Sequence, residues 1–173
     1  MSQWHTAWQG SNIVVERDGA EVDRVHAPDV SRVIIVYRGD GESSSDLSYA
    51  IAELPEEFIV FPADTGIAGR INFEHQAFWA ERGCIWWVSE AKVGVPPALR
   101  RGAWRLGRAR PGYLRLPKAE LGPLIDGWPL EGPQTWEERK WQRIERSRPF
   151  ATPSEFAALR RSQVAQGTRI WRR

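Results

Sequence analysis

Cysteine is almost absent from this sequence, since Cys84 is the only one among 173 residues. A single thiol cannot form an intramolecular disulfide, so the pattern is not that of a disulfide-stabilised secreted domain. No apolar run reaches the roughly 18 residues that a membrane-spanning helix needs, and no early stretch has the basic and apolar parts of a signal peptide. We therefore expect a cytoplasmic protein without a membrane span.

Lysine and histidine are also scarce. The chain has 3 Lys against 21 Arg, a bias typical of GC-rich bacterial genomes. The three histidines, His5, His26 and His75, are scattered, and none has a second His or Cys at the spacing of a metal-binding pair. The glycine-containing stretch 66–70 lacks the Gly-Lys-Ser/Thr of a phosphate-binding loop. The sequence therefore predicts no metal and no cofactor.

Tryptophan, by contrast, is abundant. Ten Trp residues occur in a chain that is 42% hydrophobic and 27% charged, a composition typical of folded proteins. Each indole offers a large apolar surface and one N–H donor, so many Trp residues indicate either a core built from large side chains or an aromatic recognition surface. The length suits one domain with an appendage.

Charge is distributed unevenly along the chain. Residues 1–91 hold 15 Asp and Glu against 6 Arg, whereas residues 92–173 hold 18 Lys and Arg against 7 Asp and Glu. One interpretation is that the basic part folds back on the acidic part and the charges pair internally. The other is that the basic part faces an acidic partner or a phosphate backbone.

The first half of the chain is rich in strand signals. Two β-prone runs, 12–17 and 20–25, flank Asp18-Gly19, which predicts a tight hairpin because both turn residues need positive φ. The alternation is imperfect at Val22, which indicates a bulge or a strand end. Further strands are expected at 30–37, 47–52, 58–61 and 84–88, with a continuation at 71–74 and a short helix at 76–82. The succession resembles the strongly bent antiparallel half-barrel of pleckstrin-homology-like domains, and it also fits an open α+β sheet.

These signals predict an α+β protein in three parts. Residues 1–93 form a domain with a strongly bent antiparallel sheet and one short helix. Residues 94–134, with seven Gly and seven Pro, are expected to be an irregular segment packed on it, with extended pieces only at 104–106 and 113–116. Residues 135–173 form an appendage of two helices with a basic tail. Thr135-Trp-Glu-Glu138 is a capping box that starts a helix over 136–147, and Thr152-Pro-Ser-Glu155 starts a second that ends near Gly167.

Catalytic signatures are weak. Asp64-Thr65-Gly66 follows a hydrophobic strand, as the carboxylate of an aspartic protease does, but such enzymes need two facing carboxylates and only one such motif occurs. A plain turn explains the motif better than an active site does. A hydrolase using Asp64 and His75 is therefore our third functional hypothesis, with Glu74 as a further candidate residue.

Arginines interleaved with aromatic residues provide the main functional signal. Guanidinium groups bind carboxylates or phosphates, and flat rings stack on bases or apolar surfaces. The leading hypothesis is a non-enzymatic protein-binding module of bacterial type, adaptor or immunity-like, that contacts an acidic partner through its Arg- and Trp-rich C-terminal half. The alternative is a nucleic-acid-binding protein that uses Arg100 to Arg115 and the basic tail. The predicted contact residues are Arg100, Arg101, Trp104, Arg105, Arg108, Arg110, Tyr113, Arg115 and Trp171.

Overall fold

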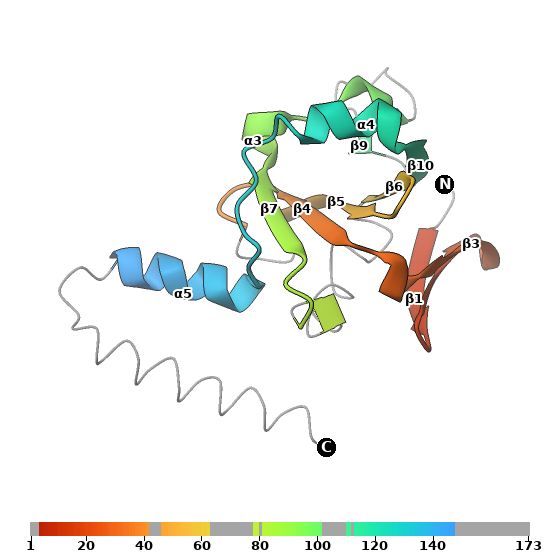
Figure 1. The fold of residues 1–173 in the computed structure, drawn as a ribbon, viewed down its shortest axis with the longest axis horizontal. Helices are drawn as coiled ribbons and strands as arrows, with labels where there is room; N and C mark the ends of the chain where they lie inside the picture. The colour runs from red at the N-terminus through yellow and green to blue at the C-terminus, as the bar shows by residue number, and fades with distance from the viewer. Residues whose placement is uncertain are drawn as a thin grey trace. The chain divides into compact units, whose positions relative to one another are not determined.

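A computed structural model shows an α+β fold (Figure 1). It describes residues 4–41, 46–62, 78–79, 81–101, 110–111 and 113–147, with only the backbone for 100–101 and 110–111. The chain divides into two units, Met1–Gln134 and Thr135–Arg173. Several predicted elements lie outside the described residues, namely the strand at 71–74, the extended piece at 104–106 and the second C-terminal helix.

An antiparallel three-stranded sheet opens the first unit. Its strands are β1 (Trp4–Gln9), β2 (Asn12–Arg17) and β3 (Ala20–His26), in that order. The predicted hairpin between β2 and β3 is confirmed, since Asp18 and Gly19 have φ values of 55° and 81°. The ladder shifts register so that Val15 pairs with Asp23 but Glu16 with Glu21. This bulge leaves Val22 outside the pairing and half exposed.

A mixed five-stranded sheet forms the centre of the unit. Its order is β10 (Leu114–Pro117), β6 (Glu57–Pro62), β5 (Leu47–Glu53), β4 (Arg32–Tyr37) and β7 (Ile85–Ser89). We expected antiparallel pairing throughout, but β7 runs parallel to β4, whereas the other three pairs are antiparallel. The long connection from β6 to β7 permits this, because a parallel neighbour needs a crossover rather than a hairpin.

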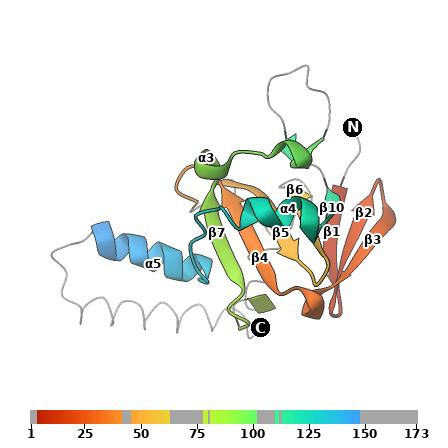
Figure 2. The same cartoon turned by 45° about the horizontal axis from the view of Figure 1, so that its top comes forward.

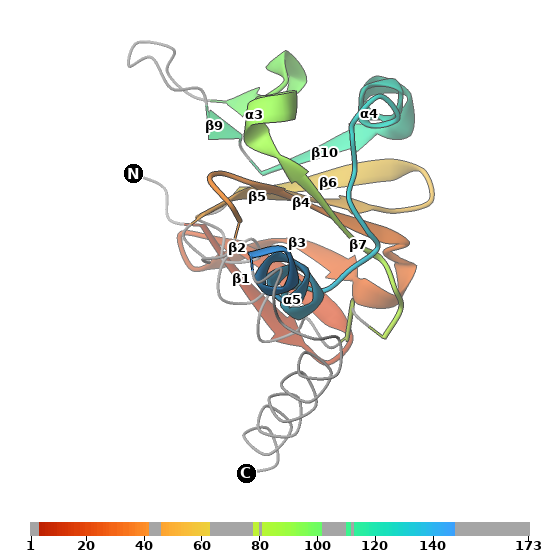
Figure 3. The same ribbon diagram turned by 90° about the vertical axis from the view of Figure 1, so that its left-hand side faces the viewer.

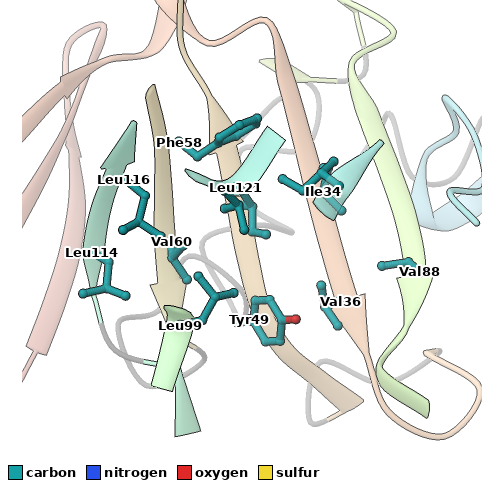
Figure 4. Packing of buried hydrophobic residues seen from close by; sticks show 12 residues of the cluster. Ile34, Val36, Tyr49, Phe58, Val60, Val88, Leu99, Leu114, Leu116 and Leu121 are labelled. Atoms are coloured by element: carbon teal, nitrogen blue, oxygen red, sulfur yellow. The ribbon is translucent and has the colours of Figure 1, made fainter. Parts of the chain in front are cut away.

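Strands β4 to β7 are buried on both faces, which explains why they read as nearly continuous apolar runs, whereas β10 alternates buried and exposed residues. One cross-strand row joins Trp86, Ile34, Ile51, Val60 and Leu114. These side chains belong to the main core or pack against it, together with residues of helix α4 (Lys118–Ile125). Figure 4 shows Ile34, Val60 and Leu114 of this row with Leu121 of α4. In Figure 3 this helix lies over one face of the sheet, and the three-stranded sheet lies on the other side. Figure 2 shows α4 running across the strands.

Segment 94–134 is more regular than expected. It contributes residues of β10 and α4 to the core. It also contains the 3-10 turn at Pro97–Leu99 and the two-residue strands β8 (Arg100–Arg101) and β9 (Arg110–Pro111). The extended piece predicted at 113–116 is confirmed by β10. We did not expect α4 because Gly122 and Pro123 lie inside it. Burial of Leu121 and Ile125 on the sheet outweighs the poor helix propensity of those two residues.

The outer edge of β7 is covered by the chain that follows α4. The Trp87 N–H donates to the Glu131 carbonyl at 2.8 Å, the Glu131 N–H donates back at 2.8 Å, and the Gln134 N–H donates to the Ile85 carbonyl at 2.9 Å. The Trp87 indole N–H also reaches the Gln134 carbonyl at 2.8 Å. Pairing of this kind removes an open strand edge. The adjacent α3 (Glu90–Val93) is a single turn.

Residues of the second unit form helix α5 (Trp136–Ser147) over the predicted range. The capping box is confirmed in both directions: the Glu138 N–H donates to Thr135 Oγ1 at 3.1 Å, and the Thr135 N–H donates to Glu138 Oε2 at 2.7 Å. The predicted helix at 76–82 is described only in part, with residues 78–79 helical and Gly83 at a φ of 58°.

Candidate partner-binding surface

The nine predicted contact residues fall into three groups. Tyr113 and Arg115 have described side chains, whereas Arg100, Arg101 and Arg110 are described by their backbone in β8 and β9. The remaining four, Trp104, Arg105, Arg108 and Trp171, lie outside the described residues.

Arg115 joins the two sheets of the first unit. Its Nε donates to Asp23 Oδ2 at 2.7 Å, and its Nη2 donates to Asp23 Oδ1 at 2.9 Å, which makes a two-pronged pair with a carboxylate on β3. Its Nη1 also donates to Glu57 at the start of β6. Arg115 is 34% exposed and Asp23 only 18%. The guanidinium therefore has two carboxylate partners within the protein, and no residue near Arg115 in the sequence indicates either of them.

Tyr113 contacts the same carboxylate. Its hydroxyl donates to Asp23 Oδ2. Its ring packs against both Trp4 and Phe61, each with a centroid separation of 5.4 Å. This geometry joins β1, β3 and β6 through one aromatic side chain, so Tyr113 serves the packing of the unit.

Electrostatics agree with this internal role. Burial acts to raise the pKa of Asp23, but hydrogen bonds from Arg115, Tyr113 and the Arg24 backbone outweigh it and lower that pKa. Burial and the bond to Asp23 raise the pKa of Tyr113, so the phenol stays protonated. The Asp23 hydrogen bond also raises the pKa of Arg115. The cluster is a stable ion pair rather than an acid and base poised for proton transfer.

Every other arginine of the first unit with a described side chain also has a partner. Arg24 pairs with Glu21 at 2.7 Å, Arg32 with Glu53 at 2.7 Å and Arg38 with Glu90 at 2.5 Å. Arg17 lies 3.9 Å from the Asp18 carboxylate, and Arg82 donates to the carbonyls of Ala27 and Pro28. The arginines of this unit whose side chains are described are therefore used for internal interactions.

Strands β8 and β9 form a short antiparallel ribbon. Arg100 pairs with Pro111 and Arg101 with Arg110. β9 also lies against β6. The ribbon therefore places three of the predicted contact residues together, and it joins the two ends of the segment that carries Trp104, Arg105 and Arg108.

Helix α5 carries large side chains that are not buried. Trp136, Trp141 and Ile144 lie within one arc of the helix, with Trp141 and Ile144 one turn apart. Lys140 Nζ lies 5.3 Å from the centre of a Trp136 ring. No residue of α5 is buried. An isolated helix of this length is only marginally stable in water, so its apolar arc requires a packing surface.

The described residues offer little for catalysis. They contain no group of three or more His, Cys, Asp or Glu that could hold a metal ion. Cys84 is buried, its Sγ contacts the Trp79 carbonyl at 3.3 Å, and burial raises the pKa of its thiol. Asp64, Glu74 and His75, which the hydrolase hypothesis requires, lie outside the described residues. No helix in the described part of the chain is both long and apolar enough to cross a membrane.

Comparison with known proteins identified no similar protein. No protein-family model matches the chain, and no similar protein was found among curated proteins or solved structures. Function must therefore be argued from the residues themselves.

Proposed function

We propose that this chain is a non-enzymatic protein-binding module, adaptor or immunity-like and of bacterial type, that contacts an acidic partner through its C-terminal half. Helix α5 carries the proposal, because its Trp141 and Ile144 side chains lie one turn apart and are only half buried. Trp is prominent among residues that dominate binding energy at interfaces.

Charge supports an acidic partner. Residues 135–173 hold ten Lys and Arg against four Glu, a net charge of +6, whereas residues 1–134 have a net charge of −4. An acidic patch on a protein can engage the basic part without approaching the acidic one. A long nucleic acid would meet repulsion from the acidic part, so charge distribution favours a protein over the nucleic-acid alternative.

The test is capture of a partner by the full chain from nuclease-treated lysate of the source organism. The captured protein is then purified and titrated against Trp141→Ala, Ile144→Ala and the control Gln142→Ala, since Gln142 lies on the opposite side of α5. Loss of a buried Trp contact typically costs about 2 kcal/mol or more, so we expect affinity to fall more than about tenfold for Trp141→Ala. The control should bind like the wild type.

Two results would contradict the proposal. Nucleic acid that elutes with salt, with no stoichiometric protein, would favour the alternative. Equal affinity of all three variants would show that α5 does not form the contact.

A further inference from the structure

An apolar patch lies on helix α4 and the turn that follows it. Leu124 is 42% exposed, and in the part of the chain that the structure describes only one other large apolar side chain, Val22, is exposed. The backbone continues to turn after α4, because the Trp128 N–H donates to the Ile125 carbonyl at 2.9 Å. Leu124 and the half-buried Trp128, four residues apart, therefore lie on the same side and form what we call the Leu124 patch.

Acidic side chains flank the Leu124 patch. Glu120 is exposed and precedes Leu124 by one turn of α4, and Asp126 is exposed on the turn after the helix. Glu131, three residues beyond Trp128, has a side chain that is 40% exposed and lies 3.5 Å from Lys92. A ligand that matches this surface combines apolar side chains with positive charge.

Helix α5 has that combination. Trp141 and Ile144 lie one turn apart and are half buried. Lys140 lies within the same arc, with its Nζ 5.3 Å from the centre of a Trp136 ring. Residues 135–173 have a net charge of +6 and residues 1–134 a net charge of −4. Each chain therefore holds an apolar patch with acidic neighbours and a helix with apolar and basic side chains.

We propose that α5 of one copy of this chain binds the Leu124 patch of a second copy, and that the two copies exchange this contact reciprocally. One such contact is small, because a 12-residue helix is only about 18 Å long, whereas a standard interface buries about 800 Å² per partner. A two-fold axis makes two identical contacts and doubles the buried area. The inference rests on the proposed function in using the same arc of α5. It adds a form of regulation, since an acidic partner competes with the second copy for that arc.

The test is sedimentation velocity of the full chain at several concentrations, without any partner. We expect a reversible dimer for wild type. Leu124→Arg places positive charge in the patch, and Trp141→Ala truncates the apolar arc of α5. Each change acts twice in a two-fold dimer, so each should raise the dissociation constant at least about tenfold. The matched control is Val22→Arg, which places the same charge at the other exposed apolar side chain and should stay within about twofold of wild type.

A mixture of the two variants distinguishes this contact from other kinds of self-association. A Leu124→Arg copy keeps its α5 intact, and a Trp141→Ala copy keeps its patch, so the mixed pair retains one of the two contacts. With different fluorophores on their N-termini, the two variants should bind each other about tenfold more tightly than either binds itself. Pairing of α5 with α5, or of patch with patch, leaves a changed residue in every contact and gives no such recovery.

Three results would overturn the inference: a wild-type chain that stays monomeric at every concentration, an equal loss in Val22→Arg, or no recovery in the mixture. Because no partner is present, these results remain separate from the test of the proposed function. If the chain is monomeric while the captured partner depends on Trp141, α5 binds the partner alone. If the dimer forms as expected while the captured partner ignores Trp141, α5 serves self-association and the proposed function fails.

Discussion

Replacing Asp23 by alanine tests whether the cluster around Arg115 holds the two sheets together. The Asp23 carboxylate accepts four hydrogen bonds: two from Arg115, one from the Tyr113 hydroxyl and one from the Arg24 N–H at 2.7 Å. The substitution removes all four and leaves Arg115 with Glu57 as its remaining carboxylate partner.

The size of the expected loss of stability depends on how buried these hydrogen bonds are. A hydrogen bond to a charged group contributes about 1.5–3 kcal/mol. The four bonds share one carboxylate and Arg115 is 34% exposed, so their contributions do not add in full and solvent screens them. We expect Asp23→Ala to lower the free energy of unfolding by about 2 kcal/mol. In a unit of this size that corresponds to a fall of about 8 °C in melting temperature.

The assay is urea unfolding followed by tryptophan fluorescence, with a double-mutant cycle of Asp23→Ala and Arg115→Ala. Most of the loss should appear as coupling between the two positions. The matched control is Glu21→Ala on the same strand, whose pair with Arg24 is exposed, so its unfolding midpoint should remain close to wild type. A loss below about 0.5 kcal/mol for Asp23→Ala, or no coupling to Arg115, would refute the reasoning, because surface pairs typically contribute that little.

Three further predictions concern stability. The folded chain lowers the pKa of Asp23, so the contribution of this carboxylate to stability is complete above about pH 4 and is lost as pH falls through its folded-state pKa. Between about pH 6 and pH 3 the urea midpoint should therefore fall less for Asp23→Ala than for wild type. Thr135→Ala removes the side-chain cap of α5 and should cost about 1 kcal/mol of helix stability, seen as lost helical circular dichroism, whereas unchanged helicity would contradict the capping role. Gly41→Ala should destabilise by about 2 kcal/mol in urea, because Gly41 has a φ of 70° and a Cβ would lie 2.6 Å from the Tyr37 ring. A wild-type midpoint would contradict this.

The sequence predicted correctly those turns and helix ends that are determined by neighbouring residues. The Asp18-Gly19 turn and the Thr135 capping box each depend on residues within one turn of chain, and both occur as expected. Helix α4 lacked such a signal, because its stability depends on packing against distant strands. Strand β1 was not predicted, although it pairs with β2 across a two-residue connection in which Gly10 has a φ of 62°. The parallel pairing of β4 and β7 also could not be predicted, since it is fixed by a crossover rather than by a turn.

The candidate site shows the same division. Arginine and aromatic composition drew attention to residues 100–115, but it did not indicate which of them the fold uses internally. The partners of Arg115 lie 92 and 58 residues away in sequence, on β3 and β6. Opposition of Arg101 and Arg110 depends on strand register, which no composition argument supplies.

The uneven charge of the chain now has two separate explanations. Internal pairing accounts for the positive charge of residues 113–118. Arg115 lies on β10, beside β6, and pairs with Asp23 and Glu57. Lys118, at the start of α4, pairs with Glu53. The register of β8 and β9 also sets Arg101 and Arg110 opposite each other, in a stretch of the sequence without acidic residues. Residues 135–173 carry a net charge of +6. Under the proposed function, an acidic partner would supply counter-charge to these positive residues, which is why we expect it to contact the C-terminal half of the chain.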